Sequence, residues 1–213
     1  MTRSGRTLHD ALMGFARTVV AGDTAAASRW LAASPDLASA CLGEGAARHG
    51  PEGYFLDEIK HHLYAGDTAL HVAAAAYRDE IAQKLMAAGA DVRARNRRGA
   101  EPLHYAVDGG PGSPIWNPSA QAATVALLVA AGADPNAVDK SGVTPLHRAV
   151  RTRCTAAVKV LLESGADIRR KNKNGSTPMQ IATRTAGRGG GSPEAKAQQR
   201  EIVRLLEQHG ASR

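Results

Sequence analysis

Two histidines that follow two acids are well suited by residue type and spacing to do chemistry. His61 and His62 come four residues after Asp57 and Glu58. On a helix each acid would lie one turn before a histidine, so the pairs could exchange protons or bind a metal ion. A working site needs further groups around it, and the neighbouring sequence predicts none. We therefore interpret the four residues as solvated salt pairs, and a metal-dependent enzyme remains only a remote alternative.

Three further histidines recur at one position of a repeated pattern, which argues against a shared metal ion. His71, His104 and His147 follow one another at intervals of 33 and 43 residues. Packed helices lie about 8–10 Å apart, whereas zinc holds each ligand atom at about 2.0–2.1 Å. Histidines one repeat apart are therefore too far separated to share an ion. We assign no catalytic residue, metal ligand or cofactor to this sequence.

A glycine-rich run near the end of the chain could bind phosphate. Gly187 and 189–191 precede Ser192-Pro193-Glu194, which has the form of a capped helix start, and free amides at a helix start attract anions. However, the lysine of a nucleotide-binding loop is missing and no strand leads into the glycines. We interpret the run as a flexible insertion. A matching insertion from Gly109 to Pro118 holds Trp116, which either anchors a partner or folds back onto the protein.

The elements that would position these residues come from an internal repeat. Four related strings, Gly-Asp-Thr-Ala-Leu-His, Gly-Ala-Glu-Pro-Leu-His, Gly-Val-Thr-Pro-Leu-His and Gly-Ser-Thr-Pro-Met-Gln, begin at Gly66, Gly99, Gly142 and Gly175, with spacings of 33, 43 and 33 residues. A Gly-Ala pair near the end of each unit forms a second signature. In the second and fourth units the two signatures are ten and twelve residues further apart. Both insertions therefore fall between the two halves of a unit.

Each unit carries the local signals of two short helices. In the third unit, Thr144 can cap the first helix and Pro145 is tolerated at its first position. Leu161 and Leu162 mark the inward stripe of the second helix, which Gly165 can end in a left-handed conformation. Helices this short cannot bury an apolar stripe alone, so the units must stack on one another.

The 33-residue period with Thr-Pro-Leu-His resembles the ankyrin repeat. The resemblance covers Gly66 to Ala211, about two thirds of the chain. It implies an all-α fold, an ankyrin-repeat solenoid of stacked helix-turn-helix units with hairpin-like finger loops, in which the repeated histidine hydrogen-bonds backbone in its turn. The expected organisation is a degenerate N-terminal helical capping repeat at 1–37, a loop and finger insertion at 38–65, repeats at 66–98, 99–141 and 142–174, and a C-terminal capping repeat at 175–213.

The N-terminal flank has a pattern of its own. An amphipathic helix is indicated by the helical spacing of Leu8, Leu12, Phe15 and Val19. Gly22 can end this helix, and Asp23 can cap a second one that contains Trp30. We interpret the two helices as the N-terminal cap, with an unrelated helical hairpin as the alternative.

Two other flanking segments give less specific signals. Residues 54–65 fit either a short helix or a strand, and the choice stays open. In the last helix Ile202 and Leu206 face inward, and Gln199 is expected on the polar outer side. This is the pattern of a C-terminal cap.

Composition limits the class of protein and its partners. The chain has 213 residues, of which 43% are hydrophobic and 4% aromatic, and its formal net charge is +7. The positive charge favours acidic partners. The two cysteines, Cys41 and Cys154, follow no paired spacing, so we expect reduced thiols. No signal peptide and no run of about 20 apolar residues is recognised, so we expect a cytoplasmic, monomeric protein without membrane association.

In ankyrin repeat proteins, partners usually bind the fingertips and the exposed end of each first helix. Carried over to this sequence, with the insertion tryptophan added, the predicted partner-binding residues are Tyr64, Asp67, Arg97, Arg98, Asp108, Trp116, Lys140, Arg151, Lys173 and Arg184. The resemblance implies a non-catalytic scaffold that binds a partner protein, and the basic character of these positions predicts an acidic surface on that partner. An electrostatic nucleic-acid-binding module is the alternative, against which stands the scarcity of aromatic residues for base stacking.

Overall fold

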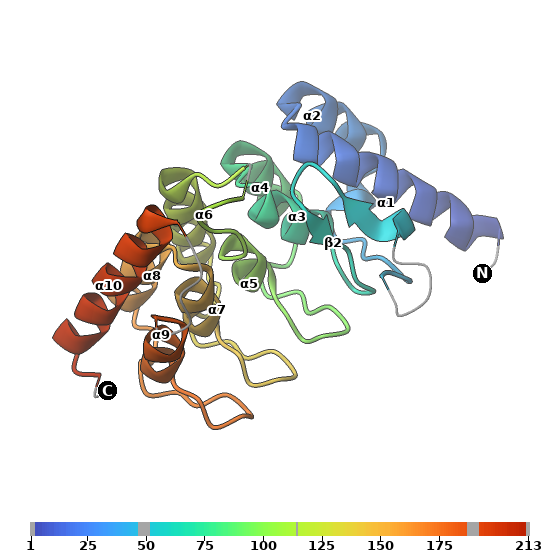
Figure 1. Cartoon of the computed structure of the whole chain (residues 1–213). Helices are drawn as coiled ribbons and strands as arrows, with labels where there is room; N and C mark the ends of the chain where they lie inside the picture. Colours follow the sequence, from blue (N-terminus) through green and yellow to red (C-terminus); the bar gives the residue numbers. More distant parts are fainter. Residues whose placement is uncertain (1–2, 47–51, 114, 187–191, 212–213) are drawn as a thin grey trace. The chain divides into compact units, whose positions relative to one another are not determined.

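The computed structural model describes residues 3–46, 52–113, 115–186 and 192–211 (Figure 1). The chain divides into two compact units, Met1–Tyr105 and Ala106–Arg213, called unit 1 and unit 2 below. Within each unit, pairs of short helices alternate with finger loops, and in the described residues the named strands belong to unit 1.

Unit 1 consists of two helix pairs with a small hairpin between them. Its elements in chain order are α1 (Arg3–Ala21), α2 (Thr24–Ala33), the 3₁₀ helices η1 (Pro35–Ala38) and η2 (Glu52–Tyr54), β1 (Phe55–Leu56), β2 (His61–His62), α3 (Ala69–Ala75) and α4 (Asp79–Ala87). The short helix α5 (Pro102–Ala106) begins in unit 1 and ends just past its boundary.

The N-terminal helix pair forms where the apolar pattern predicts it. Gly22 follows α1 with a φ of 75°, a left-handed value that glycine adopts without strain. The Asp23 carboxylate then accepts a hydrogen bond from the Ala26 amide at 2.8 Å and caps α2. Phe15 is fully buried and its ring lies 6.2 Å from that of Trp30, so the two helices share an apolar contact.

This pair packs on the next one in unit 1, α1 on α3 and α2 on α4. The Arg78 guanidinium joins the two pairs by donating a hydrogen bond to the Val20 carbonyl at 2.7 Å. The prediction that Leu8 belongs to the inward stripe is wrong, since its side chain is 48% exposed. The physical reason is length, because the 19-residue α1 extends beyond the seven-residue α3 on which it packs.

The segment that sequence reasoning left open between helix and strand contains a strand hairpin. β1 and β2 pair antiparallel, with Phe55 opposite His62 and Leu56 opposite His61. The helical arrangement that would set each acid beside a histidine is therefore not adopted, because on a strand His61 and His62 point to opposite faces. Instead the His61 ring lies 4.5 Å from the Tyr105 ring and the His62 ring lies 4.6 Å from the Phe55 ring.

A neighbouring stretch, residues 41–46, runs alongside this hairpin and widens the first finger. The Leu42 amide donates to the Asp67 carbonyl at 2.8 Å, and the Gly66 amide donates back to the Leu42 carbonyl at 2.7 Å. Further along, the Ala46 amide donates to the Leu63 carbonyl at 2.7 Å. The first finger is therefore larger than a simple turn.

Unit 2 holds the remaining helices. They are α6 (Pro118–Ala130), α7 (Pro145–Thr152), α8 (Thr155–Glu163), α9 (Pro178–Ala186) and α10 (Pro193–Gln208). α7 packs on α8 and α9, and α8 also packs on α6 and α10. Ser192 caps α10 by accepting a hydrogen bond from the Ala195 amide at 3.2 Å, as the sequence predicts. The glycine run at 187–191 lies outside the described residues.

The apolar residue of each repeated string lies in the core of its own unit. Leu70 and Leu103 are fully buried in unit 1, and Leu146 and Met179 are at most 1% exposed in unit 2. The prediction that Gln199 lies on the polar outer side of α10 is wrong. Gln199 is 3% exposed and its side-chain amide donates to the Ala182 carbonyl at 2.6 Å, so it faces α9.

Candidate partner-binding surface

Neighbouring fingers are joined at their tips by backbone hydrogen bonds. In unit 1 the Arg97 amide donates to the Ala65 carbonyl at 2.7 Å, and in unit 2 the Lys173 amide donates to the Ser141 carbonyl at 2.9 Å. In unit 2 the joined tips belong to two loops that project side by side (Figure 1). One loop lies between α6 and α7 and the other between α8 and α9. Residues 32 positions apart in sequence therefore become neighbours at a fingertip.

Glycines permit this close approach. Gly66 has a φ of +87°, and a Cβ atom placed on it would lie 2.7 Å from the Asn96 Cα of the next finger. Gly142 has a φ of +70°, and its Cβ would lie 3.0 Å from the Lys173 nitrogen. A side chain at either position would be both conformationally strained and in contact with backbone. Gly66 and Gly142 thus allow the backbones of neighbouring fingers to approach closely, which brings the predicted contact residues together.

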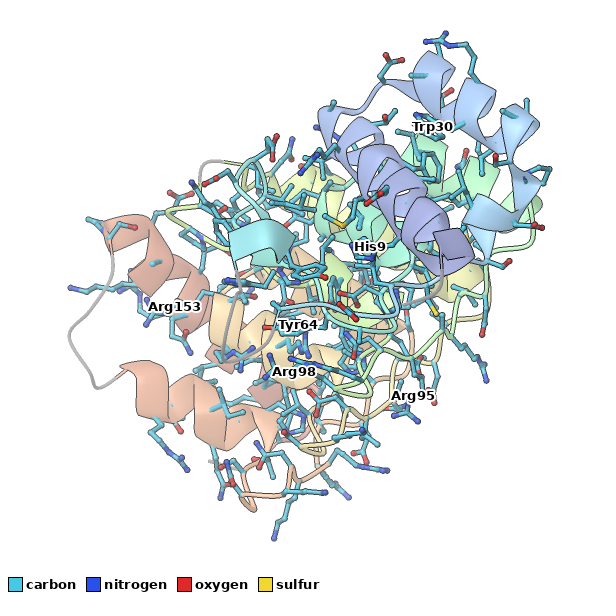
Figure 2. The ribbon with its side chains drawn as sticks, turned by 90° about the vertical axis from the view of Figure 1, so that its right-hand side faces the viewer. His9, Trp30, Tyr64, Arg95, Arg98 and Arg153 are labelled. Carbon is cyan, nitrogen blue, oxygen red and sulfur yellow. The ribbon has the colours of Figure 1, made fainter. Side chains whose placement is uncertain are left out.

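In unit 1 the structure brings three of the predicted residues into one cluster. The Arg98 guanidinium lies 4.9 Å from the centre of the Tyr64 ring and donates a hydrogen bond to its hydroxyl at 2.9 Å (Figure 2). The Arg97 guanidinium lies 5.4 Å from the same ring and also donates to the Ala46 carbonyl. Both distances are within the range of a cation–π interaction.

A buried polar network supports this cluster from below, and sequence reasoning missed it. Asp67 is 1% exposed. Its carboxylate accepts hydrogen bonds from the Tyr64 amide at 2.7 Å, the Tyr105 hydroxyl at 2.7 Å and the Asn96 side-chain amide at 2.8 Å. Asn96 in turn accepts from the Arg98 amide at 2.9 Å. Because its carboxylate is buried and used within the fold, we leave Asp67 out of the contact surface.

A signal for this network does exist in the sequence. The position of Asp67 in the other three repeats is occupied by Ala100, Val143 and Ser176. A charged residue at a position that is otherwise small or apolar indicates a local polar contact. Its partners could not be named, because they lie 29 and 38 residues away in sequence.

In unit 2 the predicted cations are at the surface. Lys140 and Lys173 are exposed at the joined fingertips, and Arg151 is exposed near the end of α7. Arg184 is exposed in the last turn of α9, where it donates a hydrogen bond to the Ser176 hydroxyl at 3.3 Å. Each unit therefore has its own fingertip surface, which consists of Tyr64, Arg97 and Arg98 in unit 1 and of these four residues in unit 2.

Asp108 belongs to an internal ion-pair network rather than to a free surface. The guanidinium of Arg148, which is 9% exposed, donates to Asp108 at 2.9 Å and to Asp139 at 3.2 Å. Burial on its own would raise the pKa of Asp139. Hydrogen bonds from the Val143 and Ser141 amides and from Arg148 outweigh burial and hold that pKa below its ordinary value. Arg148 is thus a buried cation that bridges two acids.

Trp116, the tryptophan of the described insertion, folds back toward the helices of unit 2. It is partly buried, and its indole nitrogen donates to the Gln121 side chain at 3.3 Å. Gln121 is itself buried and donates to the Gly109 carbonyl at 3.3 Å. Of the two alternatives for this residue, these contacts favour folding back over a free anchor.

The repeated histidines hydrogen-bond as the family resemblance implies. The His147 Nδ1 accepts from the Thr144 amide at 3.2 Å, and its Nε2 lies 3.0 Å from the Ser176 carbonyl. His71 makes the same pair of contacts with the Thr68 amide and the Ala100 carbonyl. Burial lowers the pKa of His147 below its ordinary value near 6.5. These rings bridge successive repeats within a unit.

Other reactive groups show no assembled chemistry in the part of the chain that the structure describes. There, no group of three or more histidine, cysteine, aspartate or glutamate side chains is arranged to hold a metal ion. Cys154 is buried, and burial raises the pKa of its thiol. None of the described helices combines the length and the apolar character needed to cross a bilayer.

Stacked helix pairs with joined finger loops define a helical-repeat protein whose candidate contact residues lie on loops and helix ends. Comparison with protein families identifies the repeat. A family model described as ankyrin repeat matches residues 65–97 and 98–140, and one described as ankyrin repeats (many copies) matches residues 128–182. Since the matched region spans more than half of the chain, the protein belongs to the ankyrin repeat family, and the predicted fold class, an all-α ankyrin-repeat solenoid, is confirmed. A search of curated proteins finds no match to this chain.

Proposed function

We propose that this protein is a non-catalytic scaffold that binds a partner protein through the fingertip surfaces of its units, and that the surface of the partner is acidic. Ankyrin repeats are generally protein–protein interaction modules, which supports the first half of the proposal. The claim that the partner surface is acidic depends on which charged groups of the fingers are exposed and which form contacts within the fold.

The observation that carries the proposal is a difference between the acids and the cations of unit 2. The finger acids Asp134, Asp139 and Asp167 each accept a hydrogen bond from a backbone amide two residues on, at 2.7–2.8 Å, so each carboxylate is partly used within its own turn. The finger and helix-end cations remain exposed, namely Lys140, Arg151, Arg169, Lys171 and Lys173. Within the described part of unit 2, the ion pairs instead involve Arg148, Lys159 and Arg204.

Unit 1 repeats this division of charge. Asp67 is buried, and the Asp91 carboxylate accepts from the Arg93 amide at 2.8 Å. Arg98 is exposed, and no ion pair to it is found among the described residues. Arg98 thus presents an exposed positive charge, whereas Arg95 of the same finger pairs with Glu101 at 3.8 Å. Such a surface attracts an acidic partner and discriminates against a basic one.

A paired charge reversal tests the proposal. The variant Arg98→Glu/Arg151→Glu reverses one exposed cation on each unit, and the control variant Lys84→Glu/Lys159→Glu changes the net charge equally. Lys84 and Lys159 lie on the second helices α4 and α8 and pair with acids of their own helix at 3.7 and 3.9 Å. Each immobilised protein is incubated with extract of the source cells, and retained proteins are quantified by mass spectrometry at two salt concentrations.

We expect the wild type and the control variant to retain the same acidic proteins. The fingertip variant should retain at least about tenfold less of them, because reversing a contact charge costs several kcal/mol. Retention should also weaken as salt rises. Equal retention by the two variants would refute the use of this surface. A gel shift with RNA and DNA at the same two salt concentrations covers the other class of partner, and a strong, salt-sensitive shift would support the nucleic-acid alternative instead.

A further inference from the structure

We propose that Arg98, held in place by Tyr64, is the anchor of the unit 1 fingertip surface, and that it binds a side-chain carboxylate of an acidic peptide segment through two parallel hydrogen bonds. This inference rests on the proposed function and names the chemistry of one contact within it. Tyr64 has the role of a positioning residue, since it acts through Arg98.

The side chain of Arg98 is held so that part of its binding edge stays available. One terminal nitrogen donates to the Tyr64 hydroxyl at 2.9 Å, and the guanidinium lies 4.9 Å from the ring centre. A guanidinium carries five N–H donors in its plane, and a single bond to the hydroxyl leaves most of them unused. Carboxylates match this planar fork with two parallel hydrogen bonds, a geometry that a lysine ammonium cannot form.

The backbone below Arg98 is also fixed. Its amide donates to the Asn96 side-chain oxygen at 2.9 Å, and the same oxygen accepts from the Ala100 amide at 3.0 Å. The side-chain nitrogen of Asn96 donates to the buried Asp67 at 2.8 Å. The anchor therefore stands on a network of buried polar contacts. Binding by such a side chain loses less conformational entropy than binding by a free one.

The charge around Arg98 favours a carboxylate from outside the chain. The Arg97 guanidinium shares the same ring at 5.4 Å, so two positive charges lie close together. The nearby acid Asp67 is buried and already accepts three hydrogen bonds. An incoming carboxylate would relieve the repulsion between the two arginines, in addition to forming its own hydrogen bonds.

An acidic peptide fits this cluster better than a nucleic acid. Sequence-independent binding of single strands uses exposed aromatic rings on which bases stack. The ring at this fingertip belongs to Tyr64, and two guanidinium groups already lie against it. In unit 2 the positions that correspond to Tyr64 and Arg98 are Lys140 and Asn174, so the ring-held arginine belongs to the first pair of fingers.

The test is an NMR titration of the full chain with an octaglutamate peptide, following the arginine side-chain Nε–H signals. The Arg98→Lys variant identifies the Arg98 signal by its loss and keeps the charge. Arg169→Lys is the matched control, because Arg169 is an exposed finger arginine with no ring contact among the described residues. Tyr64→Phe keeps the ring without the hydroxyl, and Tyr64→Leu removes both. Backbone amide spectra of each variant report whether the fold is kept.

We expect the Arg98 signal of the wild type to move on titration. Arg98→Lys should weaken peptide binding by about tenfold and Arg169→Lys by about twofold at most, because only the first removes a held fork. Tyr64→Leu should weaken binding by about three- to tenfold through the lost positioning, and Tyr64→Phe by less. This graded rescue by the ring would not arise from a general loss of structure.

Two results would overturn the inference. One is an Arg98 signal that does not move at the highest peptide concentration, or an Arg98→Lys effect equal to that of Arg169→Lys. The other is a single-stranded DNA octanucleotide that moves the Arg98 signal at lower concentration than the peptide does. Neither result depends on the paired charge reversal, which can still succeed if the fingers attract acids only through net charge.

Discussion

The buried network around Asp67 leads to a quantitative prediction about the stability of unit 1. Three donors converge on this carboxylate, from the Tyr64 amide, the Tyr105 hydroxyl and the Asn96 side chain, all at 2.7–2.8 Å. Tyr105 is 1% exposed, so water cannot replace its hydroxyl contact. A hydrogen bond to a charged group contributes about 1.5–3 kcal/mol, and a buried donor left without an acceptor costs about 1–3 kcal/mol.

The perturbation is a double-mutant cycle of Asp67→Asn and Tyr105→Phe. Asp67→Asn keeps the shape but turns one acceptor into a donor that faces other donors, and we expect it to cost about 2–3 kcal/mol. Tyr105→Phe removes the hydroxyl and should cost about 1.5–3 kcal/mol. In the double variant the bond between them is lost only once, so the costs should fall short of additivity by about 1–2 kcal/mol.

Urea unfolding measures these costs, with tryptophan fluorescence as the probe of unit 1. A Trp116→Phe background leaves Trp30, whose ring contacts Phe15 in unit 1, as the reporter. Asp57→Asn is the control, because Asp57 is 78% exposed and pairs with Lys60 at the surface. It should change stability by less than about 0.5 kcal/mol. The reasoning fails if Asp67→Asn behaves like this control, or if the two changes at Asp67 and Tyr105 are additive.

Two further predictions concern unit 2. Gly142→Ala should destabilise the unit by about 2–3 kcal/mol, whereas Gly175→Ala should cost only about 1 kcal/mol. Both glycines have a positive φ, but a Cβ at Gly142 would lie 3.0 Å from the Lys173 nitrogen, while none of the described atoms lies within 4 Å of one at Gly175. Equal costs in urea unfolding would mean that close approach of the fingers is unimportant. His147→Gln tests the sign of a pKa shift. Because burial lowers the pKa of His147, the unfolded chain takes up a proton first, so its contribution is constant above about pH 6.5 and is lost as pH falls toward the folded-state value. The wild type should therefore be more stable than the variant at pH 7.5, by about 1 kcal/mol, and this advantage should shrink at pH 5, as measured by urea unfolding at both values. A constant difference would contradict the shift.

The natural sequence shows that glutamine can occupy this position. In the fourth repeat Gln180 accepts from the Thr177 amide at 3.0 Å, as His147 accepts from the Thr144 amide. The His147→Gln variant is therefore expected to fold. The variant removes the titrating imidazole but keeps an acceptor for the Thr144 amide in the turn.

Local signals were sufficient to predict the helices, their ends and the repeat to which they belong. Gly22, Asp23 and Ser192 act within a few residues of themselves, through a left-handed conformation or a capping bond, so a sequence read locally contains the needed information. The fixed spacing of the repeated strings was likewise sufficient to predict the order of the repeats along the chain.

The use of polar side chains away from the helix caps was decided only by the tertiary structure. Asp67 and Gln199 look like surface residues in sequence, yet both are buried because partners 29 to 38 and 17 residues away come close to them. The same holds for Tyr64 and Arg98, which are 34 residues apart and meet at a fingertip. Helix and turn formation depends on neighbouring residues, so the sequence by itself determined the helices of the repeats, whereas the hairpin of β1 and β2 was identified only in the structure. Burial and hydrogen bonding of side chains depend on contacts between stacked repeats, and only the folded chain brings those contacts together.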